Sequence, residues 1–413
     1  MPKQETMETM ETTCPGCSCL CDDIIIERSD EDIKVKNACR RGAAIFKNFN
    51  VGRAVPMVEG QQVEVDEAIS TASELIADST SLAVYGMDTT TIEAQKLAIE
   101  LAEKKQAYID DCSSFCLGDL VEMSLNNDLP TTKLDEVRHN AYTIIYWGSN
   151  PFHSLPRHMS RYSYYPRGRN RSRGYEEDRF LVIVDTRSTH TSSLVKRDNV
   201  FFQVESDSEL INAFMDFMDG NSAGEYTNKI AGVLRKLKKG DAVIFGGLGL
   251  KYGLNGDYGL FREFMEKLNQ LSSVYFMPAG SHSNMRGFNE MLHQKTGCVN
   301  RYSFAQNRSG DEFEFSNLLR EKTPDTVLII GSDPVNSLPL EVSKELSHIN
   351  TVLIDPRRTY TERMSNVVIP SALSGIETGG MMIRSDGVEV ELNPVLEKEI
   401  NDEFVLQKLL EGT

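Results

Sequence analysis

Five of the eight cysteines in this chain lie close to its N-terminus, and four of them are spaced as iron–sulfur ligands are. Cys14, Cys17 and Cys21 can come from one tight loop, with Cys39 closing the set from a later segment. We therefore predict a [4Fe–4S] cluster held by these four thiolates and a role in electron transfer. Cys19 lies between Cys17 and Cys21, and it could not take the place of either ligand without a change in the loop geometry. We therefore interpret Cys19 as a non-ligand.

A structural zinc site is the main alternative, because zinc is also bound by four thiolates. Zinc sites usually pair two short cysteine knuckles, whereas Cys39 has no cysteine near it in the sequence, which favours the cluster. Cysteines without any metal are disfavoured because exposed free thiols are reactive. Arg40 and Arg41 follow Cys39, and they could either stabilise a reduced cluster or be solvated basic residues.

Beyond residue 65, apolar segments of strand length alternate with helical patterns, which is typical of βαβ units and parallel sheets. Helices are expected over residues 68–77, 91–104 and 120–125. A small hairpin is expected between the cysteine ligands, from residues 22–27 and 33–35. Buried strands are expected over residues 81–85, 107–109, 143–147, 180–184, 242–245, 274–277, 327–330 and 351–354.

Two pairs of expected strands end in matching polar sequences. Gly148-Ser149-Asn150-Pro151 matches Gly331-Ser332-Asp333-Pro334, and downstream Asp185-Thr186-Arg187 matches Asp355-Pro356-Arg357. Ligands of open α/β sheets bind beyond the carboxyl ends of strands. There glycine lets the backbone approach a phosphate, aspartate accepts hydrogen bonds from ribose or guanine, and arginine pairs with phosphate. The repeat predicts a ligand with two nucleotide-like ends; strand-end turns that recur by chance are the alternative.

Cys112 and Cys116 stand between an expected strand and an expected helix. Active-site groups often occupy such turns, and a helix N-terminus favours a thiolate, which suits a soft metal. A buried structural cysteine is the alternative there, and Cys298 is interpreted as structural.

Charge limits the partners of this chain of 413 residues, whose formal net charge is −17. This charge argues against a nucleic-acid or anionic-membrane surface. Six arginines between Arg157 and Arg173 stand out, and they could line an anion or cofactor tunnel, form a docking loop or be solvated.

No stretch approaches the roughly 18 apolar residues of a membrane span, and residues 1–13 do not resemble a signal peptide. We expect a cytoplasmic protein, where clustered cysteines bind metal rather than form disulfides.

Taken together, these features resemble the molybdopterin oxidoreductase superfamily and, within it, the family formed by the B subunits of formylmethanofuran dehydrogenase. The resemblance implies an α/β fold in which a small N-terminal Fe–S domain precedes a multi-domain, parallel-sheet molybdopterin oxidoreductase core that lacks the C-terminal β-barrel cap domain. It runs over nearly the whole chain and rests on residues 14–24, 37–40, 146–151, 156–161, 282–289 and 331–334.

The expected domains are a cluster domain, a segment with the metal-ligand loop, a nucleotide-arm domain, and a second nucleotide-arm repeat with the C-terminal segment. They cover residues 1–57, 58–140, 141–320 and 321–413.

The resemblance implies a bis-(molybdopterin guanine dinucleotide) cofactor with tungsten or molybdenum, whose metal is bound by Cys116 rather than Cys112. It implies reversible reduction of CO2 to formate with low-potential electrons, and Cys116, His282 and Arg286 as catalytic residues. The nucleotide arms would be bound by Gly148, Ser149, Asn150, Asp185, Arg187, Gly331, Ser332, Asp333, Asp355 and Arg357.

The implied partners are a β-barrel cap subunit, a subunit that condenses formate with methanofuran, and a polyferredoxin-type electron donor. Two positions depart from the family pattern. The family has histidine at Leu117 and arginine at Gly280, where a donor or a charge would face a carboxylate-like substrate. Arg286 could substitute for that arginine. The alternative function is therefore a divergent paralogue without CO2 chemistry, serving as a scaffold and electron-transfer subunit or acting on another substrate.

Overall fold

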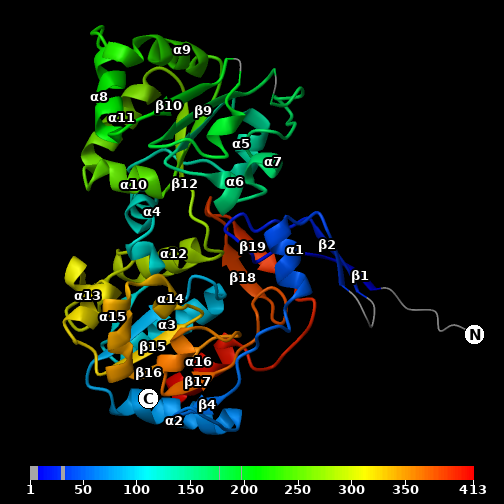
Figure 1. The fold of residues 1–413 in the computed structure, drawn as a ribbon, viewed down its shortest axis with the longest axis vertical. Helices are drawn as coiled ribbons and strands as arrows, with labels where there is room; N and C mark the ends of the chain where they lie inside the picture. The colour runs from blue at the N-terminus through cyan, green and yellow to red at the C-terminus, as the bar shows by residue number, and fades with distance from the viewer. Residues whose placement is uncertain (1–7, 29–32, 176, 197) are drawn as a thin grey trace, which may run out of the picture. The chain divides into compact units, whose positions relative to one another are not determined.

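The computed structural model describes residues 8–28, 33–175, 177–196 and 198–413. The chain forms two compact units, each built on its own sheet (Figure 1). Unit 1 comprises Met1–Phe115, His282–Arg384 and Glu389–Thr413, and unit 2 comprises Cys116–Ser281 and Ser385–Val388. The chain passes from unit 1 to unit 2 at Cys116 and returns to unit 1 at His282. The four expected domains, which were defined by function, stay a prediction. Within the described residues, no helix combines the length and apolar character that a membrane span requires.

Unit 1 contains a mixed sheet in the order β14-β13-β7-β6-β15-β16-β17-β4-β5. Strands β7, β6, β15, β16 and β17 are parallel, and the flanking strands are antiparallel. The strand order reverses between the neighbours β6 and β15: β7 lies on the other side of β6, and β16 and β17 lie on the other side of β15. The strands are β4 (Met57–Val58), β5 (Gln61–Gln62), β6 (Leu82–Gly86), β7 (Tyr108–Asp110), β13 (Tyr302–Ser303), β14 (Arg308–Ser309), β15 (Thr326–Ile330), β16 (Asn350–Ile354) and β17 (Val367–Ile369).

Both faces of this sheet are covered, because its central strands are apolar on both sides. Alternate residues of β6 divide between two cores: Leu82 and Val84 pack with helices α2, α3, α12 and α16, while Ala83 and Tyr85 pack with α13 and α15. Figure 1 shows α2, α3 and α16 beside this sheet. The helices are α2 (Val65–Asp78), α3 (Ile92–Lys104), α12 (Met285–Thr296), α13 (Phe315–Arg320), α14 (Pro334–Ser337), α15 (Leu340–Ser343) and α16 (Asp402–Gly412).

The cysteine segment also belongs to unit 1. It has a three-stranded antiparallel sheet of β1 (Glu8–Thr12), β2 (Ile24–Arg28) and β3 (Ile33–Lys36), followed by α1 (Arg40–Lys47). The expected hairpin is confirmed, since β2 pairs with β3. Hydroxyls of Thr12 and Thr13 donate to Asn393 and Glu391 beside the hairpin β18 (Gly380–Ile383) and β19 (Glu389–Leu392). These bonds fix the start of the cysteine loop to the rest of unit 1.

Unit 2 is a five-stranded parallel sheet in the order β10-β9-β8-β11-β12. The strand order reverses between β8 and β11, as in doubly wound folds. Its strands are β8 (Thr143–Trp147), β9 (Phe180–Asp185), β10 (Val200–Gln203), β11 (Ala242–Gly246) and β12 (Val274–Pro278). Its helices are α4 (Gly118–Leu125), α5 (Leu134–Asn140), α6 (Pro151–Ser154), α7 (His158–Arg161), α8 (Asp207–Met218), α9 (Thr227–Leu237), α10 (Leu248–Leu254) and α11 (Tyr258–Asn269).

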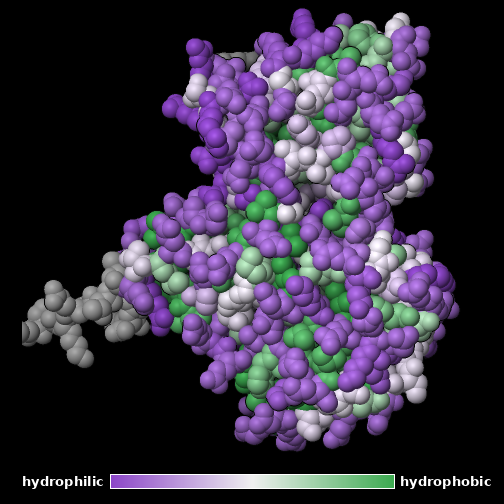
Figure 2. All heavy atoms as spheres, turned by 180° about the vertical axis from the view of Figure 1, so that it is seen from behind, coloured by the Kyte–Doolittle hydropathy of each residue, from purple (hydrophilic) through white to green (hydrophobic). Residues whose placement is uncertain are grey.

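The expected α/β alternation with parallel sheets is confirmed, and the bounds of the eight expected strands differ from those of the structure by at most one residue at each end. The first expected helix is longer, because α2 begins at Val65. Figure 2 shows a largely hydrophilic surface on the visible face of unit 2. That the N-terminal segment is an Fe–S domain and that a cap domain is lacking stay predictions.

Candidate functional site

The four predicted cluster ligands lie together in unit 1. The loop from Cys14 to Cys21 is closed by a backbone hydrogen bond from Cys14 N to Cys21 O of 2.9 Å. Cys39 is the N-cap of α1, and its sulfur accepts from Gly42 N at 3.4 Å. Gly42 also brings Cys39 and Cys14 together, because a Cβ on this glycine would lie 2.9 Å from the Cys14 sulfur.

Burial and hydrogen bonding give these thiols different acidities. Burial, with a smaller effect of the other three ligand cysteines, raises the pKa of Cys14 to about 12. A hydrogen bond from the thiol of Cys19 lowers the pKa of Cys17 to about 7, with a smaller effect of Arg41. Cys19 is fully buried beside the predicted ligands, and its thiol donates a hydrogen bond to Cys17.

The spacing of the sulfurs bears on which metal group they fit. Among the residues that the structure describes, one group of three His, Cys, Asp or Glu side chains has all its donor atoms within 4.8 Å of one another, and it contains none of these cysteines. Four zinc–sulfur bonds of about 2.3 Å would bring the sulfurs to about 3.8 Å from one another. The four cysteines therefore do not form a group that is already closed to the spacing of one zinc ion, and the metal group that they bind stays a prediction.

The sequence repeat has a matching backbone in the two units. Gly148 after β8 has φ 57° and Gly331 after β15 has φ 58°, conformations that favour glycine. Asn150 and Asp333 then have φ,ψ of −117°,75° and −122°,74°, and each begins a four-residue helix whose first residue is proline. Each loop follows a strand at the point where its sheet reverses order, which is where ligands of open α/β sheets bind.

Several polar groups of these loops bond to their own unit. Asp333 accepts from Thr361 Oγ1 at 2.7 Å and from two backbone amides, and Asn150 accepts from Thr191 Oγ1 at 2.6 Å. Arg357 donates to the carbonyls of Asn48 and Val51, at 3.2 and 2.7 Å.

The remaining loop residues differ between the units. Burial raises the pKa of Asp355 to about 7, and its carboxylate accepts from Arg357 N at 2.7 Å. Asp185 accepts from Arg187 N at 3.4 Å in the same way. Ser149 is buried, whereas Ser332 is half-buried and Arg187 is exposed. The nucleotide contacts of all these residues stay predictions.

The two cysteines of the expected metal loop lie in different surroundings. Cys112 opens a short 3-10 helix after β7, and its sulfur lies with Asp88 and His282 in the group whose donor atoms are all within 4.8 Å of one another. Cys116 belongs to unit 2 and is half-buried, two residues before the start of α4. Leu117 beside it is buried, and Asp119 accepts from Tyr258 at 2.9 Å, which fixes the first turn of α4.

The predicted catalytic side chains of unit 1 have partners within that unit. His282 forms an ion pair through Nδ1 with the buried carboxylate of Asp88, which raises the pKa of His282. Arg286 pairs with Glu290 on the same face of α12 at 2.6 Å. Their roles toward a substrate stay predictions.

Buried acids surround the His282 group. Asp110 and Asp111 end β7 and are fully buried, and burial raises the pKa of Asp110 to about 7 and the pKa of Asp111 well above its usual range. Asp88 was not identified from the sequence as a candidate site residue. Its position shortly after a buried strand could have indicated it, because the same position drew attention to Cys112.

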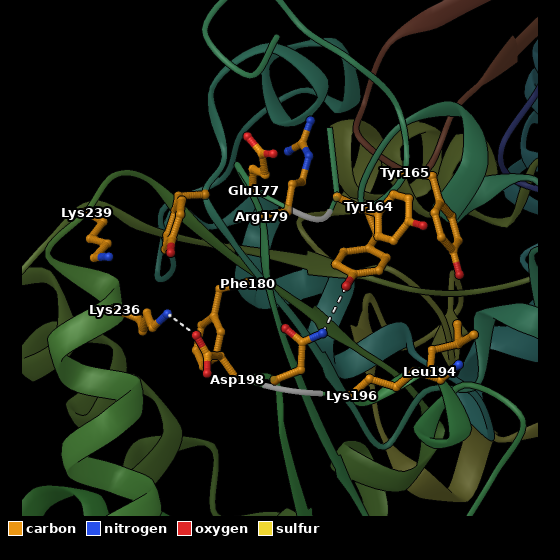
Figure 3. Close-up of a pocket in the computed structure, with 13 residues that line it drawn as sticks. Tyr164, Tyr165, Glu177, Arg179, Phe180, Leu194, Lys196, Asp198, Lys236 and Lys239 are labelled. Atoms are coloured by element: carbon orange, nitrogen blue, oxygen red, sulfur yellow. Dashed lines mark hydrogen bonds and ion pairs between the residues drawn. The ribbon is translucent and has the colours of Figure 1, made fainter. Parts of the chain in front are cut away.

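Unit 2 contains a cavity of about 610 Å³ near the first residues of β8, β9 and β10. This is the amino end of the strands, whereas the loop of Gly148 lies at their carboxyl end. Figure 3 shows Tyr164, Tyr165 and Arg179 on one side and Lys236 and Lys239 on another. None of the six arginines between Arg157 and Arg173 is among the described residues that line it. The arginine run therefore does not line this cavity, and its role as a tunnel or docking loop stays a prediction.

Comparisons with known proteins agree with the fold. The chain is 32% identical over 409 residues to the B subunit of tungsten-containing formylmethanofuran dehydrogenase 2 from Methanocaldococcus jannaschii, covering 93% of each chain. It is 29% identical over 426 residues to the protein of the same name from Methanococcus maripaludis, covering 96% of each chain. No family model matches the sequence.

Two solved structures have a similar fold. One belongs to the formyltransferase/hydrolase complex of Methylorubrum extorquens, with a TM-score of 0.67 and 20% identity, covering 86% of this chain and 98% of that one. The other is acetylene hydratase from Pelobacter acetylenicus, with a TM-score of 0.64 and 11% identity, covering 98% and 69%.

Proposed function

The chain belongs to the family formed by the B subunits of formylmethanofuran dehydrogenase, and from this premise we propose that it is the pterin- and metal-binding catalytic subunit of such a complex. The reaction proposed is reversible reduction of CO2 to formate with low-potential electrons, after which another subunit condenses formate with methanofuran. A β-barrel cap subunit and a polyferredoxin-type donor are the further partners proposed.

The matching loops at the two sheet reversals carry this proposal. A bis-(molybdopterin guanine dinucleotide) cofactor has two similar ends, and each loop pair would hold one of them. Gly148 and Gly331 give the two loops the same positive-φ turn, while Asp185 with Arg187, and Asp355 with Arg357, offer an acceptor and a cation beside each. The backbone agreement supports a shared role for the loops.

Cys116 fits the metal-ligand role in its local setting. The sulfur is half-buried and stands before the N-terminus of α4, where the helix dipole favours a thiolate over a thiol. A soft thiolate suits tungsten or molybdenum. The bound group would supply the two-electron redox chemistry, while Cys116 would anchor its metal.

The N-terminal cysteines would pass electrons to this site through a [4Fe–4S] cluster. Cys14, Cys17 and Cys21 are buried, Cys39 is half-buried, and the four lie together in unit 1. His282 would orient a substrate carboxylate through Nε2, because Nδ1 faces Asp88. Arg286 would assist only after leaving Glu290.

A second candidate function is a scaffold and electron-transfer subunit without CO2 chemistry. Leu117 and Gly280 favour it, because both are buried and neither side chain can donate a hydrogen bond. They stand where the family pattern has histidine and arginine, which would stabilise a developing negative charge.

Metal analysis of the purified complex tests the first function. The expected result is one tungsten or molybdenum atom and at least about four iron atoms per copy of this chain, with the tungsten or molybdenum lost in Cys116→Ala and kept in Cys298→Ala. A complex with iron but neither heavier metal would favour the scaffold.

A further inference from the structure

We propose that Asp88, Cys112 and His282 form a binding site for one divalent transition-metal ion, for which zinc fits best. The three donor atoms all lie within 4.8 Å of one another, and the ligands include neither Cys116 nor the N-terminal cysteines. The inference stands on this geometry and is independent of the proposed function.

Three separate segments of unit 1 bring these donors together. Asp88 lies in the loop after β6, Cys112 follows β7, and His282 precedes α12. Strands β6 and β7 are parallel neighbours, so their carboxyl ends share one edge of the sheet. The site therefore forms only in the folded unit and is not a local sequence motif.

Hydrogen bonds fix each segment before any ion binds. Asn284 donates from its backbone N to Asp88 O at 2.8 Å and from its side chain to Thr90 O at 2.7 Å, which holds the His282 segment against the β6 loop. On the other side, Asn289 and Asn300 donate to Ser113 Oγ at 2.9 and 2.7 Å. The donor atoms are thus held by a rigid framework, as a preorganised metal site requires.

The donor set is one that zinc commonly takes. Zinc binds cysteine sulfur, histidine nitrogen and carboxylate oxygen at about 2.0–2.3 Å, and sites with three protein ligands leave a fourth position open. The donors need only small shifts to reach that geometry: Asp88 and His282, which are in direct contact, would move slightly apart to admit the ion. Calcium and magnesium are disfavoured because they take oxygen ligands.

Buried carboxyl groups at this edge of the sheet are a second, independent observation. Asp88 is 2% exposed, and Asp110 and Asp111 are 1% and 0% exposed. Asp111 Oδ2 is buried and has no hydrogen-bond partner. A bound dication would be the largest local charge in such a site and would stabilise nearby carboxylates.

The donor set goes beyond an ion pair between Asp88 and His282, because the Cys112 sulfur lies within 4.8 Å of both of their donor atoms. An ion held through Nδ1 of His282 leaves Nε2 with a proton, so the same histidine can still donate to a substrate.

Zinc content and zinc K-edge absorption of the purified complex, dialysed against zinc and then against buffer, test the site. We expect about one zinc per chain with one sulfur and two or three nitrogen or oxygen neighbours. Cys112→Ser should lose this zinc, and the near-isosteric Asp88→Asn should bind it at least about tenfold more weakly. Cys116→Ser and Cys298→Ser, the matched controls, should keep it.

Three results would overturn the site: less than a fifth of a zinc per wild-type chain, equal zinc in Cys112→Ser, or a zinc with four sulfur neighbours. The last would place zinc on the N-terminal cysteines. Thermal unfolding of each variant checks that it is folded, and Asp88→Asn keeps the test decisive where Cys112→Ser is not. Failure of the proposed function would appear separately, as absence of tungsten and molybdenum.

Discussion

Replacing Gly42 by alanine sets two effects against each other beside the predicted cluster. Gly42 lies in the first turn of α1, where a change from glycine to alanine alone would stabilise the helix by about 1 kcal/mol. The new methyl group, however, would lie 2.9 Å from the sulfur of Cys14, well inside van der Waals contact, and 3.8 Å from that of Cys39.

The steric effect should win. Cys14 is 8% exposed, so its sulfur cannot move into solvent, and inserting a methyl into a packed site costs about 1–3 kcal/mol. We expect Gly42→Ala to be destabilised by about 0–2 kcal/mol and to lose most of its iron, because the Cys14 sulfur must leave its ligand position.

Gly232 in α9 is the matched control, since a methyl there would meet nothing within 4 Å. Gly232→Ala should gain about 1 kcal/mol and leave the iron content unchanged. Iron per chain, the spectrum of the reduced cluster and the midpoint of thermal unfolding are the measurements. Full iron and a gain in stability in Gly42→Ala would show that Cys14 does not bind the cluster where the structure places it.

Three further predictions concern buried polar groups. Burial raises the pKa of Asp402 from 3.8 to about 7, so between about pH 4 and 7 the folded state binds a proton that the unfolded state has lost. The free energy of unfolding should therefore fall as the pH rises through this range. Asp402→Asn should remove this pH dependence in denaturant unfolding and should be up to about 4 kcal/mol more stable than the wild type above pH 7. Arg179→Met should lower the free energy of unfolding in urea by about 3 kcal/mol, because four carbonyl groups each lose a hydrogen bond from the guanidinium. Arg173→Met, at an exposed position, should lower it by under about 0.5 kcal/mol. Equal losses of stability in the two variants would contradict this expectation. Asp333→Ala should cost about 2 kcal/mol and Asn150→Ala about 1 in thermal unfolding. Asp333 accepts three hydrogen bonds from Tyr360 and Thr361, whereas the Asn150 side chain accepts one from the Thr191 hydroxyl. A larger loss in Asn150→Ala than in Asp333→Ala would refute this reasoning.

Local patterns predicted most of the elements but not their assembly. The strands are short apolar runs, and their parallel pairing follows from the alternation with helices. The pairing of β6 with β15 joins segments far apart in the chain, and no local pattern indicates it. For the same reason the compact units cut the chain at Cys116 and His282, positions without a composition change.

The candidate site shows the same division. The repeat around Gly148 and Gly331 was visible as sequence and has a matching backbone. What the sequence did not indicate is that Asn150, Asp333 and Arg357 bond within their own units. A hydrogen-bond acceptor next to a strand end looks the same in sequence whether it binds a ligand or its own loop.

The most direct test of the central claim is formate-dependent reduction of viologen by the purified complex. We expect activity in the wild type and in Cys298→Ala, and none in Cys116→Ala, with the cluster signal retained in all three. Equal activity in Cys116→Ala, or no activity in a wild-type complex that contains its metal, would contradict it.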